Sequence, residues 1–356
     1  MSPFSLVISS SIGTVICFVL LFLLSIVDIP SVPLFMTISI IVSGASSFFA
    51  LTAYLGVFRF ISDLPSNSYV RMMSIGFGVA SVLTSGMRLG SALLFPRTPG
   101  SPSHSDASFY FILATIVCTL ATISFYYIRN SVERLSNSKK QAKDQAENSS
   151  SIAAYSKADD VPLKSLLGKV WWKFFCLFIV SFQIALVVPN ILYLTASSSP
   201  SQNILVSEQV FPLFCLFIMS IFDFAGRLAL KWRFFSNIPT SFWSSIAIFR
   251  FFLVGLLLSG NISPILSPNL KFSMLPSLYA SDFLYFVLIF LFGCSSGSIT
   301  TVMLMKIPPS FESAKSRKRV TTWMVGIQSL GFLTGTFMSF GLKYLLYASA
   351  LNMGEI

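Results

Sequence analysis

Long apolar runs alternate with short polar segments along almost the whole chain. Each run has about 20 residues and few charges, the length that an α-helix needs to cross the hydrocarbon core of a bilayer. The runs are continuously apolar, so a transmembrane β-barrel, whose strands alternate polar and apolar residues, is disfavoured. The pattern predicts nine spanning helices, at residues 4–27, 33–58, 70–95, 108–128, 170–195, 209–230, 240–260, 280–304 and 321–348.

One long hydrophilic segment interrupts this series after the fourth span. Residues 129–167 are rich in lysine, acidic residues and serine. Such a composition cannot bury a core, so we expect a disordered linker. The linker divides the chain into a four-helix block at residues 1–128 and a five-helix block at residues 168–356. The expected fold class is an all-α polytopic membrane protein built from two transmembrane bundles.

Composition and charge agree with this interpretation. Of the 356 residues, 54% are hydrophobic and only 10% are charged, whereas a soluble chain has about 25% charged residues. The net charge is +11. The basic residues gather in short segments between the spans, which is typical of the positive-inside rule and not of a nucleic-acid-binding face.

The distribution of basic residues predicts the orientation in the membrane. One side of the predicted spans holds only Arg97, Lys271 and Lys343. We therefore expect the N-terminus and the linker to be cytoplasmic and the C-terminus to be outside or lumenal. The basic residues of the cytoplasmic side are Arg59, Arg71, the lysines and arginines of the linker, Lys231, Arg233, Lys306, Lys315, Arg317, Lys318 and Arg319.

Enzymatic chemistry has little support in this sequence. The single histidine, His104, falls in a predicted loop, and no span contains a pair of carboxylates. There is no P-loop pattern for ATP. The five cysteines form no CxxC pair, so neither a zinc site nor a disulfide framework is expected. We expect a protein that is not an enzyme and that uses no metal or cofactor.

Four ionisable residues lie inside predicted spans: Arg88, Asp223, Arg227 and Arg250. Each costs about 2.5–3.5 kcal/mol on insertion, so such residues indicate function by default. Asp223 and Arg227 are four residues apart and share a helix face. Arg250 lies near the middle of its span, and we hypothesise that Asp223 is shared between Arg227 and Arg250. The cluster could be a structural lock or a site for a polyhydroxylated solute.

Small residues and a proline predict how the helices pack. Pro189 should kink the fifth span. Glycines four residues apart allow close helix–helix approach in lipid. Such pairs are Gly86 with Gly90, Gly293 with Gly297, and Gly331 with Gly335.

Several segments, taken in order, resemble one transporter family. Residues 221–227 carry an Asp followed by Gly-Arg, as in that family's eighth helix. Residues 80–89 are similar to its fifth helix and residues 250–261 to its ninth. Ser-Ser-Gly at residues 295–297 and the paired glycines at residues 331–335 stand where its tenth and eleventh helices have Ser-Asn-Gly and a glycine-rich pair. The chain thereby resembles the equilibrative nucleoside transporters.

The resemblance implies a helical bundle like that of the major facilitator superfamily, with eleven helices in the family. It implies facilitated diffusion of nucleosides, sometimes nucleobases, by alternating access. It also implies that Asp223 and Arg227 contact the ribose hydroxyls of the substrate. Arg88 and Arg250 would support these two residues or act in gating.

The chain also departs from the family pattern. Ser220 replaces an Asn before the Asp motif, and Ser296 replaces the Asn of Ser-Asn-Gly. Leu51 lies near the position where some members have a base-reading Gln. The first predicted span resembles the family's third helix, so counterparts of the first two helices are missing. We expect a divergent member, either shortened or given a start codon assigned too late.

The leading hypothesis is therefore facilitative nucleoside transport in a plasma or organelle membrane, with the nucleoside and the lipid bilayer as partners. Two alternatives stay open. The first is a facilitator of another polyhydroxylated solute, and the second is a truncated membrane protein that does not transport.

Overall fold

The structure is a computed structural model. It describes residues 3–27, 31–62, 67–95, 104–147, 163–197, 205, 207, 210–232, 235, 238–260, 281–307 and 314–352. In these residues the chain forms α-helices joined by short irregular turns, and it forms no sheet.

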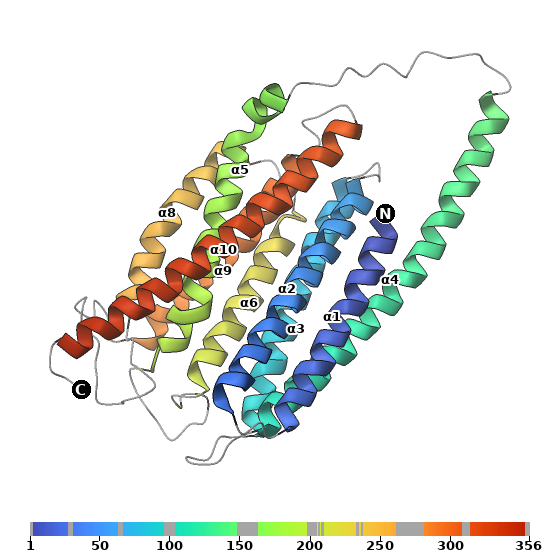
Figure 1. The fold of residues 1–356 in the computed structure, drawn as a ribbon. Helices are drawn as coiled ribbons and strands as arrows, with labels where there is room; N and C mark the ends of the chain where they lie inside the picture. Colours follow the sequence, from blue (N-terminus) through green and yellow to red (C-terminus); the bar gives the residue numbers. More distant parts are fainter. Residues whose placement is uncertain are drawn as a thin grey trace. The chain divides into compact units, whose positions relative to one another are not determined.

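Nine α-helices account for almost all of the described residues (Figure 1). Eight are long and apolar enough to cross a membrane, and the fifth has a shorter apolar part, Val170–Leu186. Each of the nine predicted spans corresponds to one helix, so the prediction of an all-α, multi-pass integral membrane protein is confirmed. The helices are α1 (Pro3–Ile26), α2 (Val32–Ser62), α3 (Asn67–Leu94), α4 (His104–Glu147), α5 (Leu163–Leu186), α6 (Phe211–Ala229), α8 (Thr240–Leu258), α9 (Asp282–Lys306) and α10 (Ala314–Asn352).

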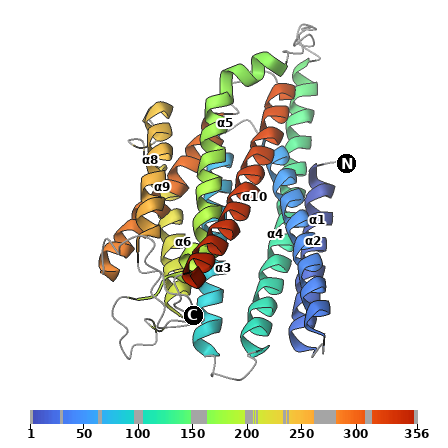
Figure 2. The same ribbon diagram turned by 60° about the vertical axis from the view of Figure 1, so that its left-hand side comes forward.

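The helices pack in two compact units. Unit 1 consists of residues 1–64, 97–166 and 311–322, and it contains α1, α2 and α4. Helix α1 packs against both α2 and α4, and the three lie side by side in Figures 1 and 2. The ring of Phe4 stacks on that of Phe125 with centroids 5.2 Å apart. The Ser25 and Ser108 hydroxyls form a 2.8 Å hydrogen bond between α1 and α4.

Helix α4 continues well past the apolar run that predicts it. Residues 129–147 are helical, where the composition predicts the start of a disordered linker. The segment contains no proline or glycine and is rich in Lys, Gln, Glu and Ala. These residues favour helix even when they are too polar to join a core. Residues 148–162 of the predicted linker lie outside the described residues.

Unit 2 consists of residues 65–96, 167–310 and 323–356, and it contains α3, α5, α6, α8, α9 and most of α10. The division of the chain into membrane blocks at residues 1–128 and 168–356 stays a prediction. Helix α3 lies within the first predicted block, but its contacts are with α6 and α9 of unit 2. Helix α9 is the most buried of the candidate spans, and it packs against α6, α8 and α3. Unit 2 therefore has its core around α9.

Helix α5 ends at a break near Pro189. A π-turn (Val187–Ile191) and a 3₁₀ turn (Leu192–Leu194) follow Leu186. Because proline has no N–H, the helical hydrogen-bond series cannot continue through it. Ser339 on α10 donates to the Leu186 carbonyl at 2.8 Å, and Asn190 Nδ2 donates to Ser339 Oγ at 2.9 Å. The predicted interruption is confirmed, and α10 supplies the polar groups that stabilise it.

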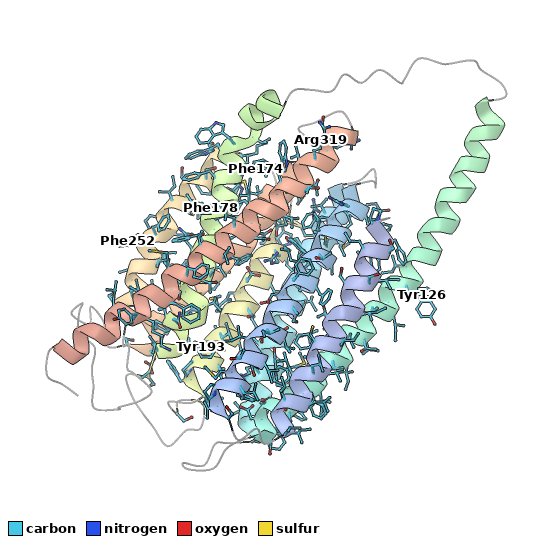
Figure 3. The ribbon with its side chains drawn as sticks, viewed as in Figure 1. Tyr126, Phe174, Phe178, Tyr193, Phe252 and Arg319 are labelled. Carbon is cyan, nitrogen blue, oxygen red and sulfur yellow. The ribbon has the colours of Figure 1, made fainter. Side chains whose placement is uncertain are left out.

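Two of the predicted glycine pairs make close helix contacts: Gly293 with Gly297 on α9, and Gly331 with Gly335 on α10. A Cβ on Gly331 would lie 2.6 Å from the Phe178 carbonyl oxygen, and one on Gly335 would overlap the Phe182 carbonyl. Helices α5 and α10 accordingly lie side by side in both ribbon views (Figure 2). Phe252 on α8 instead projects away from the bundle (Figure 3) and is 59% exposed, as expected for a side chain that faces lipid.

Candidate functional site

The site is built on α6, whose sequence dictates a regular helix. Pro212 stands in its first turn, where the missing N–H costs nothing. The four-residue spacing then places Asp223 and Arg227 on one face, and Arg227 Nε donates to Asp223 Oδ2 at 2.7 Å. The exposed fraction of the side chain is 13% for Asp223 and 12% for Arg227. The ion pair is therefore largely sheltered but not sealed.

A directed series of hydrogen bonds holds the guanidinium from α3 and α9. Arg227 Nη1 donates to Ser74 Oγ at 2.9 Å, and it lies 3.3 Å from the Ser74 carbonyl oxygen. The hydroxyls of Ser74 and Thr301 are 2.6 Å apart. Thr301 Oγ1 donates its proton to the Gly297 carbonyl at 2.7 Å, so Ser74 must donate to Thr301. Each hydroxyl thus has one acceptor and one donor, and such a chain fixes the orientation of Arg227.

Glycines bring the α6 and α9 backbones together at the ion pair. A Cβ on Gly226 would overlap the Cys294 carbonyl, and one on Gly297 would overlap the Asp223 carbonyl. On α3, a Cβ on Gly78 would lie 2.9 Å from Arg227 Cδ. The close approach explains why the site carries Gly-Arg on α6 and Ser-Ser-Gly on α9: only glycine leaves room for backbone contact at this depth.

Ser220 lies on α6 one turn before Asp223 and is 3% exposed. Its hydroxyl accepts from Ser81 Oγ on α3 at 3.2 Å and donates to the Leu216 carbonyl at 3.0 Å. Ser220 therefore extends the polar contact between α3 and α6 that begins at Ser74. The structure brings together Ser220, Asp223 and Arg227.

The structure does not bring Arg250 to Asp223. Arg250 is completely buried, and its Nη2 donates to the Phe292 carbonyl at 3.4 Å. Among the described residues, Asp223 forms an ion pair with Arg227 and none with Arg250. The hypothesis that Asp223 is shared between two arginines is therefore wrong for this structure, because Arg250 turns toward α9 instead of toward the carboxylate.

The other candidate residues take separate places. Ser296 is buried on α9 and is 2% exposed. Arg88 lies partly buried on α3. Leu51 belongs to unit 1, on α2, where it is 41% exposed.

Sequence reasoning missed Ser74, which accepts from Arg227, and Thr301, which accepts from Ser74. Serine and threonine are common in apolar helices, where their hydroxyls usually bond the carbonyl one turn back. No spacing in the sequence distinguishes these two from the many others of that kind. The only signal is indirect: Ser74 and Gly78 are four residues apart, so the face of α3 that bears Ser74 is also the face that admits Arg227.

A charge swap tests which arginine pairs with Asp223. Exchanging the two charges by Asp223→Arg with Arg227→Asp should recover folded protein relative to Asp223→Arg alone, because the swap preserves one ion pair on one helix face. The double variant Asp223→Arg with Arg250→Asp should recover none. The measurement is the monodisperse yield by size-exclusion chromatography. Equal recovery in both double variants would contradict the observed pairing.

Comparison with known proteins agrees with the motifs that the structure brings together. A family model described as nucleoside transporter matches residues 37–344, from within α2 to within α10. No curated protein matches the chain. The matched range covers most of the sequence and includes every residue of the polar site on α3, α6 and α9. The family is one of transporters and not of enzymes, and the chain belongs to this nucleoside transporter family.

Proposed function

We propose that this protein moves nucleosides across a membrane by facilitated diffusion, and that Asp223 and Arg227 contact the sugar. Family membership implies nucleoside transport, and the long apolar helices can carry the site within the bilayer. The single observation that carries the assignment of residues is the Asp223–Arg227 ion pair, which is held at 2.7 Å and remains partly exposed.

The chemistry of the pair suits a neutral, hydroxyl-rich ligand. Arg227 uses Nε and Nη1 to hold Asp223 and Ser74, and its Nη2 makes no hydrogen bond among the described residues. Asp223 Oδ1 is likewise without a protein donor there. A carboxylate oxygen accepts from hydroxyls and a guanidinium N–H donates to oxygens. Two neighbouring ribose hydroxyls can therefore bond both groups at once.

The ion pair also limits what the site binds. The two opposite charges cancel, so a neutral solute adds no charge to the low-dielectric interior. We propose that the substrate moves by alternating access, with the site exposed in turn to each side, as in transporters with a central site. No ion coupling is required, and net flux follows the nucleoside gradient. The N-terminus is cytoplasmic in this proposal, as the positive-inside pattern predicts.

Flux through the purified protein tests the proposal. Proteoliposomes that contain the full chain should take up labelled uridine or adenosine saturably, down its gradient and without a proton gradient. Unlabelled ribonucleosides should compete at least about tenfold better than 2′,3′-dideoxynucleosides, because the latter lack the hydroxyls that bond Asp223. Sugars without a base should compete weakly.

The competitors also separate the alternatives. Flux that free sugars inhibit as well as nucleosides do would favour a facilitator of another polyhydroxylated solute. Vesicles that show no solute flux, together with a protein that shows no nucleoside-dependent thermal shift, would favour a protein that does not transport.

A further inference from the structure

A second buried cation lies outside the Asp223–Arg227 pair. The guanidinium of Arg250 on α8 is 0% exposed. Its central carbon stands 4.2 Å from the centroid of the Phe292 ring on α9, and Nη2 donates to the Phe292 carbonyl at 3.4 Å. Nε and Nη1 have no partner in the part of the chain that the structure describes. Buried donors without partners are costly, and those of a charged group most of all.

The acids of unit 2 do not balance this charge. Asp223, the acid whose charge reaches Arg250, is already paired with Arg227. The other acid on the described helices of this unit is Asp282, which accepts from Ser197 Oγ. Asp282 begins α9, about 15 Å along the helix from Phe292. The one carboxylate near these two guanidiniums is bonded to Arg227, so the buried charges of Asp223, Arg227 and Arg250 sum to +1.

A buried hydroxyl without a partner stands on α9 one helical turn after the residue that contacts Arg250. Ser296 is one helical turn after Phe292, so its side chain projects from the face of α9 that meets Arg250. Its Oγ is buried and has no hydrogen-bond partner among the described residues. A helical serine usually bonds a carbonyl three or four residues back, as Ser295 Oγ does with the Phe292 carbonyl, whereas Ser296 Oγ makes no such bond among the described residues. The Ser296 hydroxyl therefore stays available as a donor.

We propose that a small monovalent inorganic anion, of the charge and size of chloride, binds between Arg250 and Ser296. The anion accepts from Arg250 Nε and Nη1 and from Ser296 Oγ, three buried donors that have no partner among the described residues. A water molecule could accept the same bonds, but it would leave the net positive charge in place. The anion neutralises the cluster and ties α8 to α9, so its first effect is on the stability of the fold.

Thermal unfolding without any nucleoside tests the proposal independently of transport. The purified full chain is melted in detergent in sodium gluconate, and gluconate is replaced stepwise by chloride, bromide, nitrate or bicarbonate at constant ionic strength and pH. Tm should rise by a few degrees and saturate with the monovalent anions that fit the site, because a ligand that binds only the folded state stabilises it. Sulfate, which is larger and divalent, should not produce this rise.

Two adjacent serines give a matched pair of variants. Ser296→Ala should abolish most of the chloride-dependent rise in Tm, because it removes one of the three groups that donate to the anion. Ser295→Ala removes a hydroxyl that bonds the helix itself, so the chloride-dependent rise should stay as in the wild type. Arg250→Gln should show no chloride response. If Arg250→Gln does not fold, the chloride-dependent rise in Tm of Ser296→Ala compared with that of Ser295→Ala still tests the proposal.

Bromide provides a direct observation of the site. Crystals grown in bromide should show an anomalous peak within hydrogen-bond distance of Arg250 and Ser296. Equal Tm in gluconate and chloride would overturn the proposal, since it is the result expected if water alone fills the site. A chloride-dependent rise that is the same in Ser296→Ala and in the wild type would also overturn it, because the anion would then bind elsewhere.

Discussion

Replacing Asp223 by asparagine should reduce nucleoside uptake per folded molecule roughly ten- to hundredfold. It should also lower the amount of folded protein, because Arg227 loses its counter-charge. Asparagine has the same shape and keeps one acceptor oxygen, but it loses the charge. Hydrogen bonds to a charged group contribute about 1.5–3 kcal/mol, which corresponds to the expected range in affinity. The measurement is initial uptake of labelled uridine, normalised to the protein recovered by size-exclusion chromatography.

Asp282→Asn is the matched control for this variant. It makes the same chemical change at the start of α9, where the carboxylate bonds Ser197 and has no role in the proposed site. Its uptake should remain within about twofold of wild type, since a helix-terminal hydrogen bond affects stability more than transport. Uptake near the wild-type rate in Asp223→Asn would contradict the proposed contact with the sugar.

The large features of this fold follow from the sequence because they depend on one-dimensional patterns. A continuous apolar run has to be a helix in a bilayer, where every backbone group must bond within its own segment. Pro189 breaks α5 for a reason that is entirely local. The Asp223–Arg227 pair is also local, since a four-residue spacing on a helix is enough to bring the two side chains together.

What the sequence does not contain is the rotation of each helix about its axis. The same glycine spacing occurs on α3 and on α9, yet a Cβ on Gly90 would meet nothing within 4 Å, while one on Gly297 would overlap the Asp223 backbone. For the same reason, spacing could not show that Arg250 turns toward Phe292. The hydrogen bond from Arg227 to Ser74 also joins two helices, and sequence patterns do not predict such contacts.

The polar segment after the fourth predicted span is a second place where the structure differs from the sequence-based prediction. The composition of residues 129–147 predicts that they cannot join a core, and the structure still makes them the last part of α4. Helix formation requires only favourable backbone propensity, whereas core formation requires apolar surface. Composition that excludes burial therefore does not exclude helix.

A single methyl group at Gly297 should strongly destabilise the fold. The Cβ of Gly297→Ala would overlap the Asp223 carbonyl oxygen and would lie 3.1 Å from Arg227 Cγ. A backbone atom cannot rotate away, so α6 and α9 must separate. We expect an overpacking cost of about 1–3 kcal/mol, a lower Tm and a severe loss of uptake.

The loss of uptake should exceed what the loss of folded protein explains. Separating α6 from α9 also moves Arg227 on α6 away from Thr301 on α9, whose hydrogen bond with Ser74 belongs to the chain that orients Arg227. Gly255→Ala on α8 is the control, because its added Cβ would meet nothing within 4 Å. That variant should be neutral or more stable by up to about 1 kcal/mol, since alanine favours helix over glycine. If the two variants melt at the same temperature, the close α6–α9 contact does not support the site, and the orientation of Arg227 must depend on α3 alone.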